Sequence, residues 1–270
     1  MKADLHIHST VSDGSDDVGQ LVDKAIKKGL DAMAVTDHDT LSHLTQISAL
    51  HGTGIKVIGG MEMSAVHRKS NTRVHILGYH IQKPEIVTAL TLPILEARSR
   101  NSEKQAEILN RLGYKIDVDK LARADGKYLY KQHIMDWLVT TGQVPDMFGD
   151  FYQKTFKNGG VCAFDIEYTD VFDAVKAIKE AGGLAVLAHP GQQRNFWLIP
   201  ELVRIGLDGL ELNHYANSEE DKEMIHSYAN QYDLFLTGGS DNHGKYESQP
   251  FSIGDFLSEE SGVKSICFFG

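Results

Sequence analysis

The chain has 270 residues, enough for one large α/β domain or for a domain with a sizeable insertion. Hydrophobic residues make up 41% and charged residues 24%, which is ordinary globular usage and argues against disorder. The formal net charge of −10 argues against a broad grip on duplex nucleic acid. With no membrane-length apolar run and no secretory signal, we expect a cytoplasmic protein that does not act at a membrane.

The first apolar run carries polar residues at a spacing of two. Alternate side chains of a β-strand share a face, so in DLHIHS the side chains of Asp4, His6 and His8 point the same way. Two imidazoles on one strand face can chelate a divalent ion, and a nearby carboxylate can orient one of them. For this stretch alone, a polar face that meets water is the alternative interpretation.

Short apolar runs that carry or reach polar residues recur along the chain. In order, the polar residues are Asp37, His38 and Asp39; Glu62; His75; His189; Asn213 and His214; Asp241 and His243. Helical patterns lie between them, at residues 18–28, 40–50, 171–181, 199–205 and 219–232. Alternating strands and helices predict βα units around a parallel sheet, and polar residues at the ends of at least five strands favour a closed barrel.

The alternation breaks between residues 83 and 159. A long helical pattern contains Pro93, where we expect a kink or a boundary, and helical stretches follow in DVDKLARADG and HIMDWLVTTG. We therefore predict a barrel domain formed by residues 1–82 and 160–270, with a helical insertion at residues 83–159 as a lid over the barrel mouth.

Imidazole and carboxylate side chains dominate the polar clusters, and the two cysteines lack CxxC spacing. Such a donor set suits manganese, iron or zinc in a hydrolytic site. Each cluster has a structural explanation of its own, such as helix capping by TDHD. Their joint occurrence at strand ends points instead to a multinuclear metal centre.

Six ordered motifs, DLHIHS, TDHD, GMEMS, VHILGY, AHPG and GSDNH, resemble those of the polymerase and histidinol phosphatase (PHP) superfamily of metal-dependent phosphoesterases. The resemblance covers nearly the whole chain and is closest to the small stand-alone nucleotide phosphatases. It implies an α/β fold, a distorted (β/α)7 TIM-like barrel with three divalent ions. The implied ligands are His6, His8, Glu62 and Asp241 for the first ion, Asp13, His38 and His243 for the second, and Glu62, His75 and His189 for the third.

The resemblance also implies a mechanism, hydrolysis of a phosphoester by a hydroxide that bridges metal ions. The residues implied to hold this hydroxide are Glu62, Asp241, His38 and His243. Asp4 and Asp37 are expected to hold ligand residues in place rather than to bind metal.

Four residues are candidates for substrate contact. Arg100, in RSRN, resembles an arginine of the family, with a solvated helix surface as the alternative. Arg194 follows AHPGQ, where a guanidinium could bind phosphate through two parallel hydrogen bonds. His133 lies where close relatives carry a histidine, although the residues that follow it here differ from theirs, and His214 is a candidate general acid.

The leading hypothesis is a phosphatase that acts on a nucleotide or a nucleoside 3′,5′-bisphosphate. The alternatives are a 5′→3′ exonuclease on short single-stranded RNA or DNA, a histidinol-phosphate phosphatase, and a non-catalytic module that binds metal or nucleotide. The expected partner is therefore a small phosphorylated compound or a short single-stranded oligonucleotide.

Overall fold

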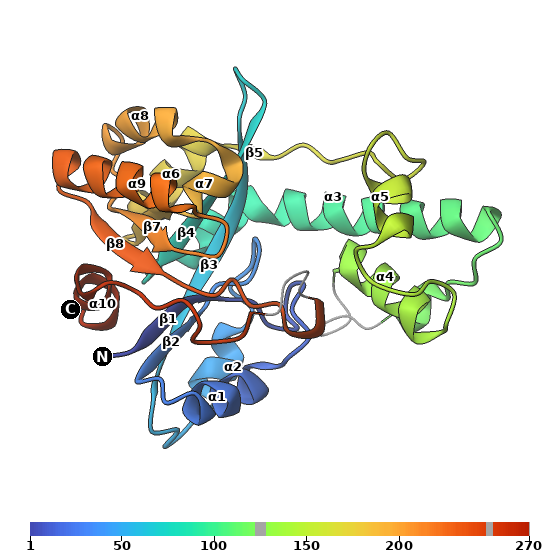
Figure 1. Ribbon diagram of the computed structural model, residues 1–270, viewed down its shortest axis with the longest axis horizontal. Coiled ribbons are helices and arrows are strands. Elements are labelled where there is room, and N and C mark those ends of the chain that lie inside the picture. The colour runs from blue at the N-terminus through green and yellow to red at the C-terminus, as the bar shows by residue number, and fades with distance from the viewer. Residues whose placement is uncertain (122–127, 247–250, 270) are drawn as a thin grey trace.

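The computed structural model describes residues 1–121, 128–246 and 251–269. Within these residues one mixed sheet forms the centre, in the order β1-β2-β3-β4-β6-β7-β8, and the short β5 pairs with β3 (Figure 1). The strands are β1 (Ala3–Ile7), β2 (Ala32–Val35), β3 (Lys56–His67), β4 (Thr72–Tyr79), β5 (Thr169–Asp170), β6 (Leu184–Leu187), β7 (Gly209–Asn213) and β8 (Phe235–Gly238).

Hydrogen bonds between the two edges of the sheet nearly close it into a barrel. The amide of Asp241, just past β8, donates to the carbonyl of His6 at 2.8 Å, and the amide of His8 donates to the carbonyl of Asn242 at 3.0 Å. At the other end of β1, the amide of Ser258 donates to the carbonyl of Ala3 at 2.9 Å. The predicted distorted barrel is confirmed.

One strand departs from the predicted parallel arrangement. β4 runs antiparallel to both β3 and β6, because a tight turn at residues 68–71 joins it to β3 in place of a helix. Because β4 runs in the opposite direction, its first residues lie at the same end of the sheet as the last residues of the parallel strands. His75 therefore reaches the barrel mouth from within its strand, and it pairs with Ser64 of β3.

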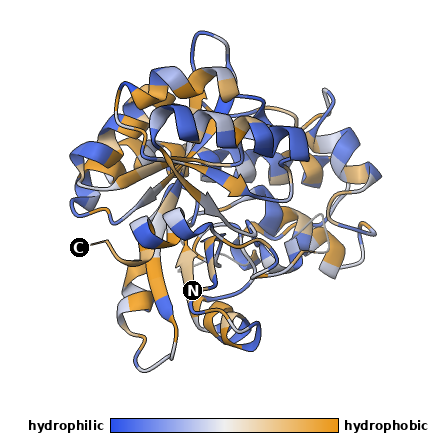
Figure 2. Ribbon diagram, turned by 60° about the vertical axis from the view of Figure 1, so that its left-hand side comes forward, coloured by the Kyte–Doolittle hydropathy of each residue, from blue (hydrophilic) through white to orange (hydrophobic). Residues whose placement is uncertain are grey.

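Amphipathic helices cover the outside of the barrel. α1 buries Val18, Leu21, Val22 and Ala25, a helical spacing, and it begins with a capping box between Asp17 and Gln20. In Figure 2, much of the orange, hydrophobic colour lies on the strands between these helices. The other helices around the barrel are α2 (Leu44–Ser48), α6 (Val171–Glu180), α7 (Pro190–Gln193), α8 (Ile199–Val203), α9 (Glu219–Tyr232) and α10 (Glu260–Cys267), with 3₁₀ turns η3 (Phe196–Leu198) and η4 (Gly244–Tyr246).

The helix expected at residues 40–50 is much shorter than predicted. It covers only Leu44–Ser48, because the chain before it forms a loop held by side-chain contacts to Asp37 and Asp39. The patterns at residues 18–28, 171–181, 199–205 and 219–232 do form helices, within one or two residues of the expected ends.

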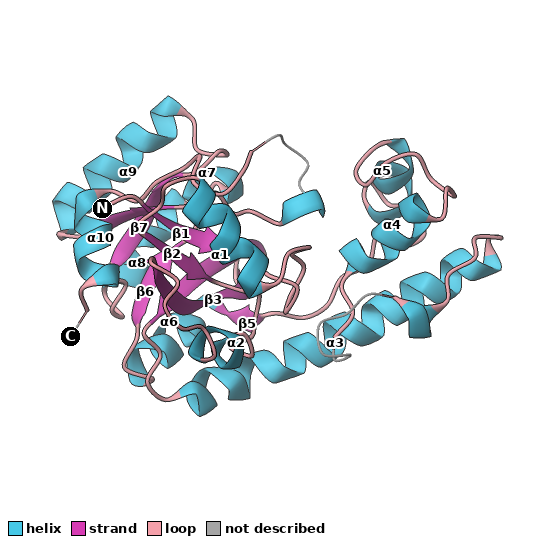
Figure 3. Ribbon diagram, turned by 90° about the horizontal axis from the view of Figure 1, so that it is seen from below, coloured by secondary structure: helices cyan, strands magenta, loops and turns pink. Residues whose placement is uncertain are grey.

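The segment predicted as an insertion is helical and extends away from the sheet in Figure 3. It contains α3 (Pro84–Arg111), η1 (Val118–Lys120), α4 (Lys131–Thr140) and α5 (Asp150–Phe156). In DVDKLARADG, only the turn η1 is helical among the described residues, and residues 122–126 lie outside them. The helices share an apolar cluster that includes Ala106, Leu109, Leu129, Ile134 and Leu138. The division into domains at residues 83 and 159 stays a prediction.

Of the two alternatives expected at Pro93, the boundary is wrong, because α3 continues through the proline, and the kink stays a prediction. Thr91 before the proline and Ile94 and Leu95 after it are buried, so packing on both sides offsets the lost backbone hydrogen bond. Among the described helices, none combines the length and the hydropathy that a bilayer crossing requires.

Candidate metal centre

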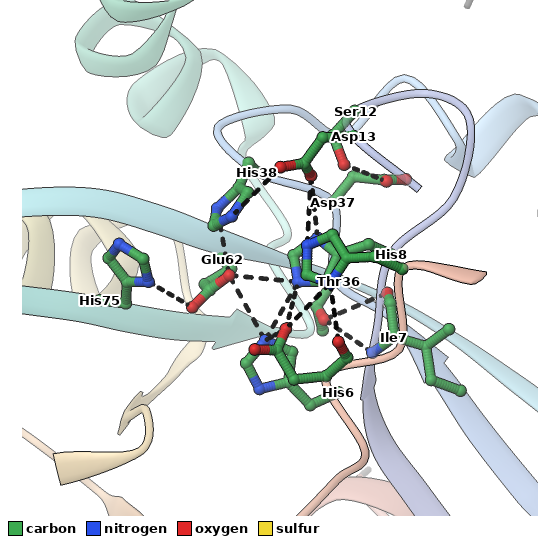
Figure 4. Close-up of polar contacts among 12 residues, drawn as sticks. His6, Ile7, His8, Ser12, Asp13, Thr36, Asp37, His38, Glu62 and His75 are labelled. Atoms are coloured by element: carbon green, nitrogen blue, oxygen red, sulfur yellow. Dashed lines mark hydrogen bonds and ion pairs between the residues drawn. The ribbon is translucent and has the colours of Figure 1, made fainter. Parts of the chain in front are cut away.

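The predicted metal ligands converge at one end of the barrel (Figure 4). Three sets of side chains each place one donor atom from every member within 4.8 Å of the others. These sets are His8, Asp13, His38 and His243; His6, His8, Glu62 and Asp241; and His38, Glu62 and His75. His189, the remaining predicted ligand, lies beside them with its Nε2 2.9 Å from Glu62 Oε1.

Glu62 lies at the centre of this cluster because β3 continues beyond the end of β2. Its Oε1 lies 2.7 Å from His75 Nδ1, and its Oε2 lies 3.1 Å from His38 Nδ1 and 3.2 Å from His8 Nε2. Burial alone would raise the pKa of Glu62, but the surrounding histidines, His75 foremost, hold this pKa well below its usual range. The carboxylate is therefore an anion that faces several imidazoles at once.

Two aspartates complete the cluster around His8. Asp241 Oδ1 lies 3.0 Å from His8 Nε2 and 3.3 Å from His6 Nε2. Asp13 Oδ1 lies 3.4 Å from His243 Nε2. Burial opposes ionisation of Asp241, yet His6 and the other histidines lower its pKa well below the ordinary value.

The donor set fits a group of divalent cations. Several buried donor atoms that face the cluster lack a hydrogen bond within the described part of the chain, among them His38 Nδ1, Asp13 Oδ1 and Asp241 Oδ1. An unpartnered buried polar atom is costly, so such a concentration indicates a missing partner. Carboxylate oxygens and imidazole nitrogens without thiolate are the donors that manganese, iron and zinc accept.

Glu211 of β7 is a member of this site that the sequence analysis missed. Its Oε1 lies 2.9 Å from His6 Nδ1, and its Oε2 accepts the backbone amide of His189 at 2.8 Å. With Nδ1 of His6 bound in this way, Nε2 faces the cluster. A signal exists in the sequence, since Glu211 is a lone carboxylate inside the strand GLELN.

Asp4 accepts hydrogen bonds from backbone amides and not, as expected, from the imidazole of a ligand histidine. Its Oδ1 accepts the amides of Ser240 at 3.0 Å and His6 at 3.3 Å, and its Oδ2 accepts the amide of Gly254 at 2.8 Å. Burial raises the pKa of Asp4 to about 6 despite these hydrogen bonds. The carboxylate thus fixes the chain on both sides of the barrel seam, next to Asp241.

Asp37 fixes the loop before His38. It accepts hydrogen bonds from the amide and hydroxyl of Ser9 at 2.8 and 2.6 Å and from the hydroxyl of Ser12 at 2.6 Å. His43 Nδ1 lies 2.8 Å from its Oδ2. These contacts join the loop that carries Asp13 to the loop that carries His38.

Arg98, not Arg100, points toward the cluster. Arg100 pairs at 3.6 Å with Glu96 on the same helix, and its side chain is 67% exposed. Arg98 donates to Asp39 Oδ2 at 2.6 Å and to Ser64 Oγ at 3.0 Å, next to the His38 loop.

Of the other three predicted substrate contacts, only His214 lies at the cluster, with Nε2 3.4 Å from Asp241 Oδ2. His133 is buried at the start of α4, where its Nδ1 accepts the amide of Tyr130 at 3.1 Å. Arg194 is 78% exposed and lies 3.3 Å from Asp221. Substrate contact by these residues stays a prediction.

The insertion reaches the cluster through α4. Gln132 Nε2 donates to Asp13 Oδ2 at 2.8 Å, and the hydroxyl of Tyr130 donates to the carbonyl of His38 at 3.1 Å. Two cavities meet there. One, of about 260 Å³, is lined by donor residues of the cluster, among them Glu62 and His75, and both cavities are lined by Asp13 and Gln132. We call the other, of about 380 Å³, the insertion cavity; Arg98, Gln105, Lys131, Tyr152 and Lys157 line it as well.

Comparison with known proteins agrees with this geometry. The PHP domain family model matches residues 4–186. A relative from Eggerthella lenta, named phosphoribosyl 1,2-cyclic phosphate 1,2-diphosphodiesterase, is 42% identical and aligns over 93% of this chain and 97% of its own. A 5′-3′ exoribonuclease from Haemophilus influenzae is 30% identical over 90% of both chains. A 3′,5′-nucleoside bisphosphate phosphatase from Chromobacterium violaceum is 29% identical over 90% of this chain and 88% of its own.

A solved structure shares the fold. The crystal structure described as a metal-dependent phosphoesterase from Bifidobacterium adolescentis superposes with a TM-score of 0.89 and 29% identity, over 99% of this chain and 96% of that one. The expected barrel, hydrolase class and superfamily are thereby confirmed. The chain belongs to the PHP domain family and is a metal-dependent phosphoesterase.

Proposed function

We propose that this phosphoesterase hydrolyses a phosphoester of a small ribosyl compound that carries two phosphate groups. The observation that carries the proposal is the convergence of three donor sets, two of which include Glu62, beside a cavity of about 380 Å³. A cavity of that size suits one small ligand rather than an extended strand. Phosphoribosyl cyclic phosphate is the first substrate to test, because the relative of that name shares 42% identity over nearly its whole length. A nucleoside 3′,5′-bisphosphate is the second.

The proposed ligand sets are those implied by the sequence, with three divalent ions of manganese, iron or zinc. They are His6, His8, Glu62 and Asp241; Asp13, His38 and His243; and Glu62, His75 and His189. When bound, such ions neutralise charge on the phosphoryl oxygens and lower the pKa of water toward neutrality. Glu62 belongs to two of these sets, so its two oxygens tie them together.

The residues around the ligands keep the donor atoms in place. Glu211 accepts the Nδ1 proton of His6, which directs Nε2 of that ring toward the cluster. The amide of Ala216 donates to His214 Nδ1 at 3.1 Å, so the ring proton of neutral His214 is at Nε2, facing Asp241. We therefore assign His214 to holding Asp241, in place of the general-acid role expected from the sequence.

The test is hydrolysis by the manganese-loaded protein, followed by phosphorus NMR. The panel contains 5-phosphoribosyl 1,2-cyclic phosphate, adenosine 3′,5′-bisphosphate, histidinol phosphate and a 5′-phosphorylated RNA trinucleotide. We expect cleavage of at least one of the first two, its loss in His8→Ala, and its retention in His226→Ala, which removes an exposed imidazole from α9. Cleavage of the trinucleotide alone would assign the chain to the exoribonucleases, and cleavage of histidinol phosphate alone would also overturn the proposal.

A further inference from the structure

The insertion cavity offers space for the part of a substrate that does not react. It shares Asp13 and Gln132 with the cavity around the metal cluster, so the two spaces adjoin. Gln132 and Lys131 are consecutive on α4 and point to different places: Gln132 donates to Asp13, whereas the Lys131 ammonium lies over the rings of Phe156 and Tyr152, 5.5 and 5.9 Å from their centres. Gln132 and Asp13 thus lie at the boundary of the two spaces, with Lys131 on the side of the insertion cavity.

The part of this cavity lined by Lys131 and Lys157 carries positive charge that no carboxylate of the described residues neutralises. Arg73 is paired with Asp165 and Arg98 with Asp39. In the described ranges, neither Lys131 nor Lys157, which both line the cavity, has a carboxylate oxygen within 4.0 Å of its ammonium. Burial, and then repulsion by Lys157 and Arg73, lowers the pKa of Lys131 to about 8. Cations that repel one another in a recess are stabilised when an anion enters.

A neutral residue of the cavity lining has an oxygen without a hydrogen-bond partner in the described part of the chain. Gln105 is fully buried; its Nε2 donates to the carbonyl of Cys162 at 2.9 Å, while its Oε1 has no hydrogen-bond partner among the described residues. A buried carbonyl oxygen on the cavity lining can accept a hydrogen bond from a hydroxyl of the ligand. The lining therefore combines an acceptor with unpaired cations, which suits a phosphorylated sugar.

We infer that the insertion cavity is a subsite for a second, non-reacting phosphate of the substrate, and that Lys131 is the residue that selects substrates carrying it. The inference deepens the proposed function and rests on it, since the reacting phosphoester is placed at the metal cluster. Loss of one charge-assisted hydrogen bond to this phosphate should weaken binding by about 10–150-fold.

The test compares substrates that differ only in the second phosphate. The pairs are 5-phosphoribosyl 1,2-cyclic phosphate with ribosyl 1,2-cyclic phosphate, and adenosine 3′,5′-bisphosphate with adenosine 3′-phosphate. We expect the protein to prefer the doubly phosphorylated member by at least about tenfold in kcat/KM. Lys131→Gln should remove most of this preference and Lys131→Arg should keep it. Lys154→Gln, a matched change at an exposed lysine of α5 that pairs with Asp150, should also keep it.

Each outcome decides the inference. A preference that survives Lys131→Gln, or an equal loss on both members of a pair, would overturn it while leaving the phosphoesterase proposal intact. If no panel substrate reacts, the proposed function fails, and binding of ribose 5-phosphate to chelator-treated protein then tests the subsite alone by calorimetry. Binding that needs Lys131 supports the subsite; binding independent of Lys131, or none, overturns it.

Discussion

His6 Nδ1 lies 2.9 Å from Glu211 Oε1, and both side chains are completely buried. The carboxylate also accepts the amide of His189, so one side chain aligns two of the proposed ligands. Burial opposes ionisation of Glu211, but His6 lowers the pKa of this carboxyl below its ordinary value. Glu211 is thus an anion that fixes both the orientation and the tautomer of His6.

Glu211→Gln should weaken manganese binding by about 10–100-fold while the protein stays folded. The glutamine side chain has no negative charge. Its NH₂ group, itself a donor, must face one of the two donors that Glu211 accepts from, the His6 ring or the His189 backbone amide. Calorimetric titration of metal-free protein with Mn²⁺ measures the effect, and circular dichroism checks the fold. Glu223→Gln, at an exposed position of α9, is the control; equal affinities in the two variants would contradict the role of Glu211.

The number of bound ions should depend on which carboxylate is removed. Glu62 belongs to two donor sets and Asp13 to one. After dialysis against manganese, we expect Asp13→Asn to lose about one equivalent of metal and Glu62→Gln to lose about two, because each set needs its carboxylate. Plasma emission spectrometry of the dialysed proteins gives the count. Losses of the same size in both variants would show that Glu62 does not connect the sets.

The preference for a second phosphate should depend on pH. Lys131 has its pKa lowered to about 8, so it is charged at pH 7 and mostly neutral at pH 9. Its neighbours Arg73, Arg98 and Lys157 are cations, while burial raises the pKa of Tyr152 and raises that of Cys162 to about 11. These two groups thus stay neutral throughout that range.

As the pH rises from 7 to 9, KM for the doubly phosphorylated substrate should therefore increase by about tenfold relative to its counterpart without the second phosphate. Dividing by the counterpart cancels the titration of the metal centre. Lys131→Arg, whose guanidinium stays charged, should give a flat ratio. A ratio that rises in this variant as steeply as in the unmodified protein would assign the effect to another group.

Two arginines on one helix should differ sharply in their contribution to stability. Arg98→Ala leaves the fully buried Asp39 without its cation, at a cost of about 3 kcal/mol; we take the low end of the usual range because Arg98 is 19% exposed. Arg100→Ala removes only an exposed pair with Glu96 and should cost about 0.5 kcal/mol or less. Urea unfolding of both variants in chelator measures the difference. Similar shifts of the two midpoints would show that the Arg98–Asp39 pair does not stabilise the fold.

Sequence reasoning found the strand-end donors because their pattern depends on local rules. The spacing of two in DLHIHS follows from the alternation of a strand, and the polar ends of successive runs follow from βα order. Glu211 escaped because it lies within its strand, and a single carboxylate there does not reveal which histidine it meets. The direction of β4 escaped for a related reason, since strand pairing depends on the turn at residues 68–71 and not on the strand itself.

The choice between Arg98 and Arg100 shows a second limit of the sequence. Positions two apart on a helix differ by about 200° around its axis, so one faces the barrel when the other faces water. Only the packing of α3 against the barrel decides which one does. Pro93 is similar, because the burial of Thr91, Ile94 and Leu95, rather than local propensity, keeps the helix continuous.

The seam of the barrel has a consequence for the order in which this protein matures. Asp241 and His8 contribute backbone hydrogen bonds to the seam, and their side chains lie in the same donor cluster. During synthesis His6 and His8 emerge well before Asp241 and His243, which lie more than 230 residues later in the chain. A growing chain therefore lacks part of two donor sets until residues 241–243 have been made. Metal loading should consequently follow the synthesis of residues 241–243. The bound ions would then link β1 to the segment that follows β8.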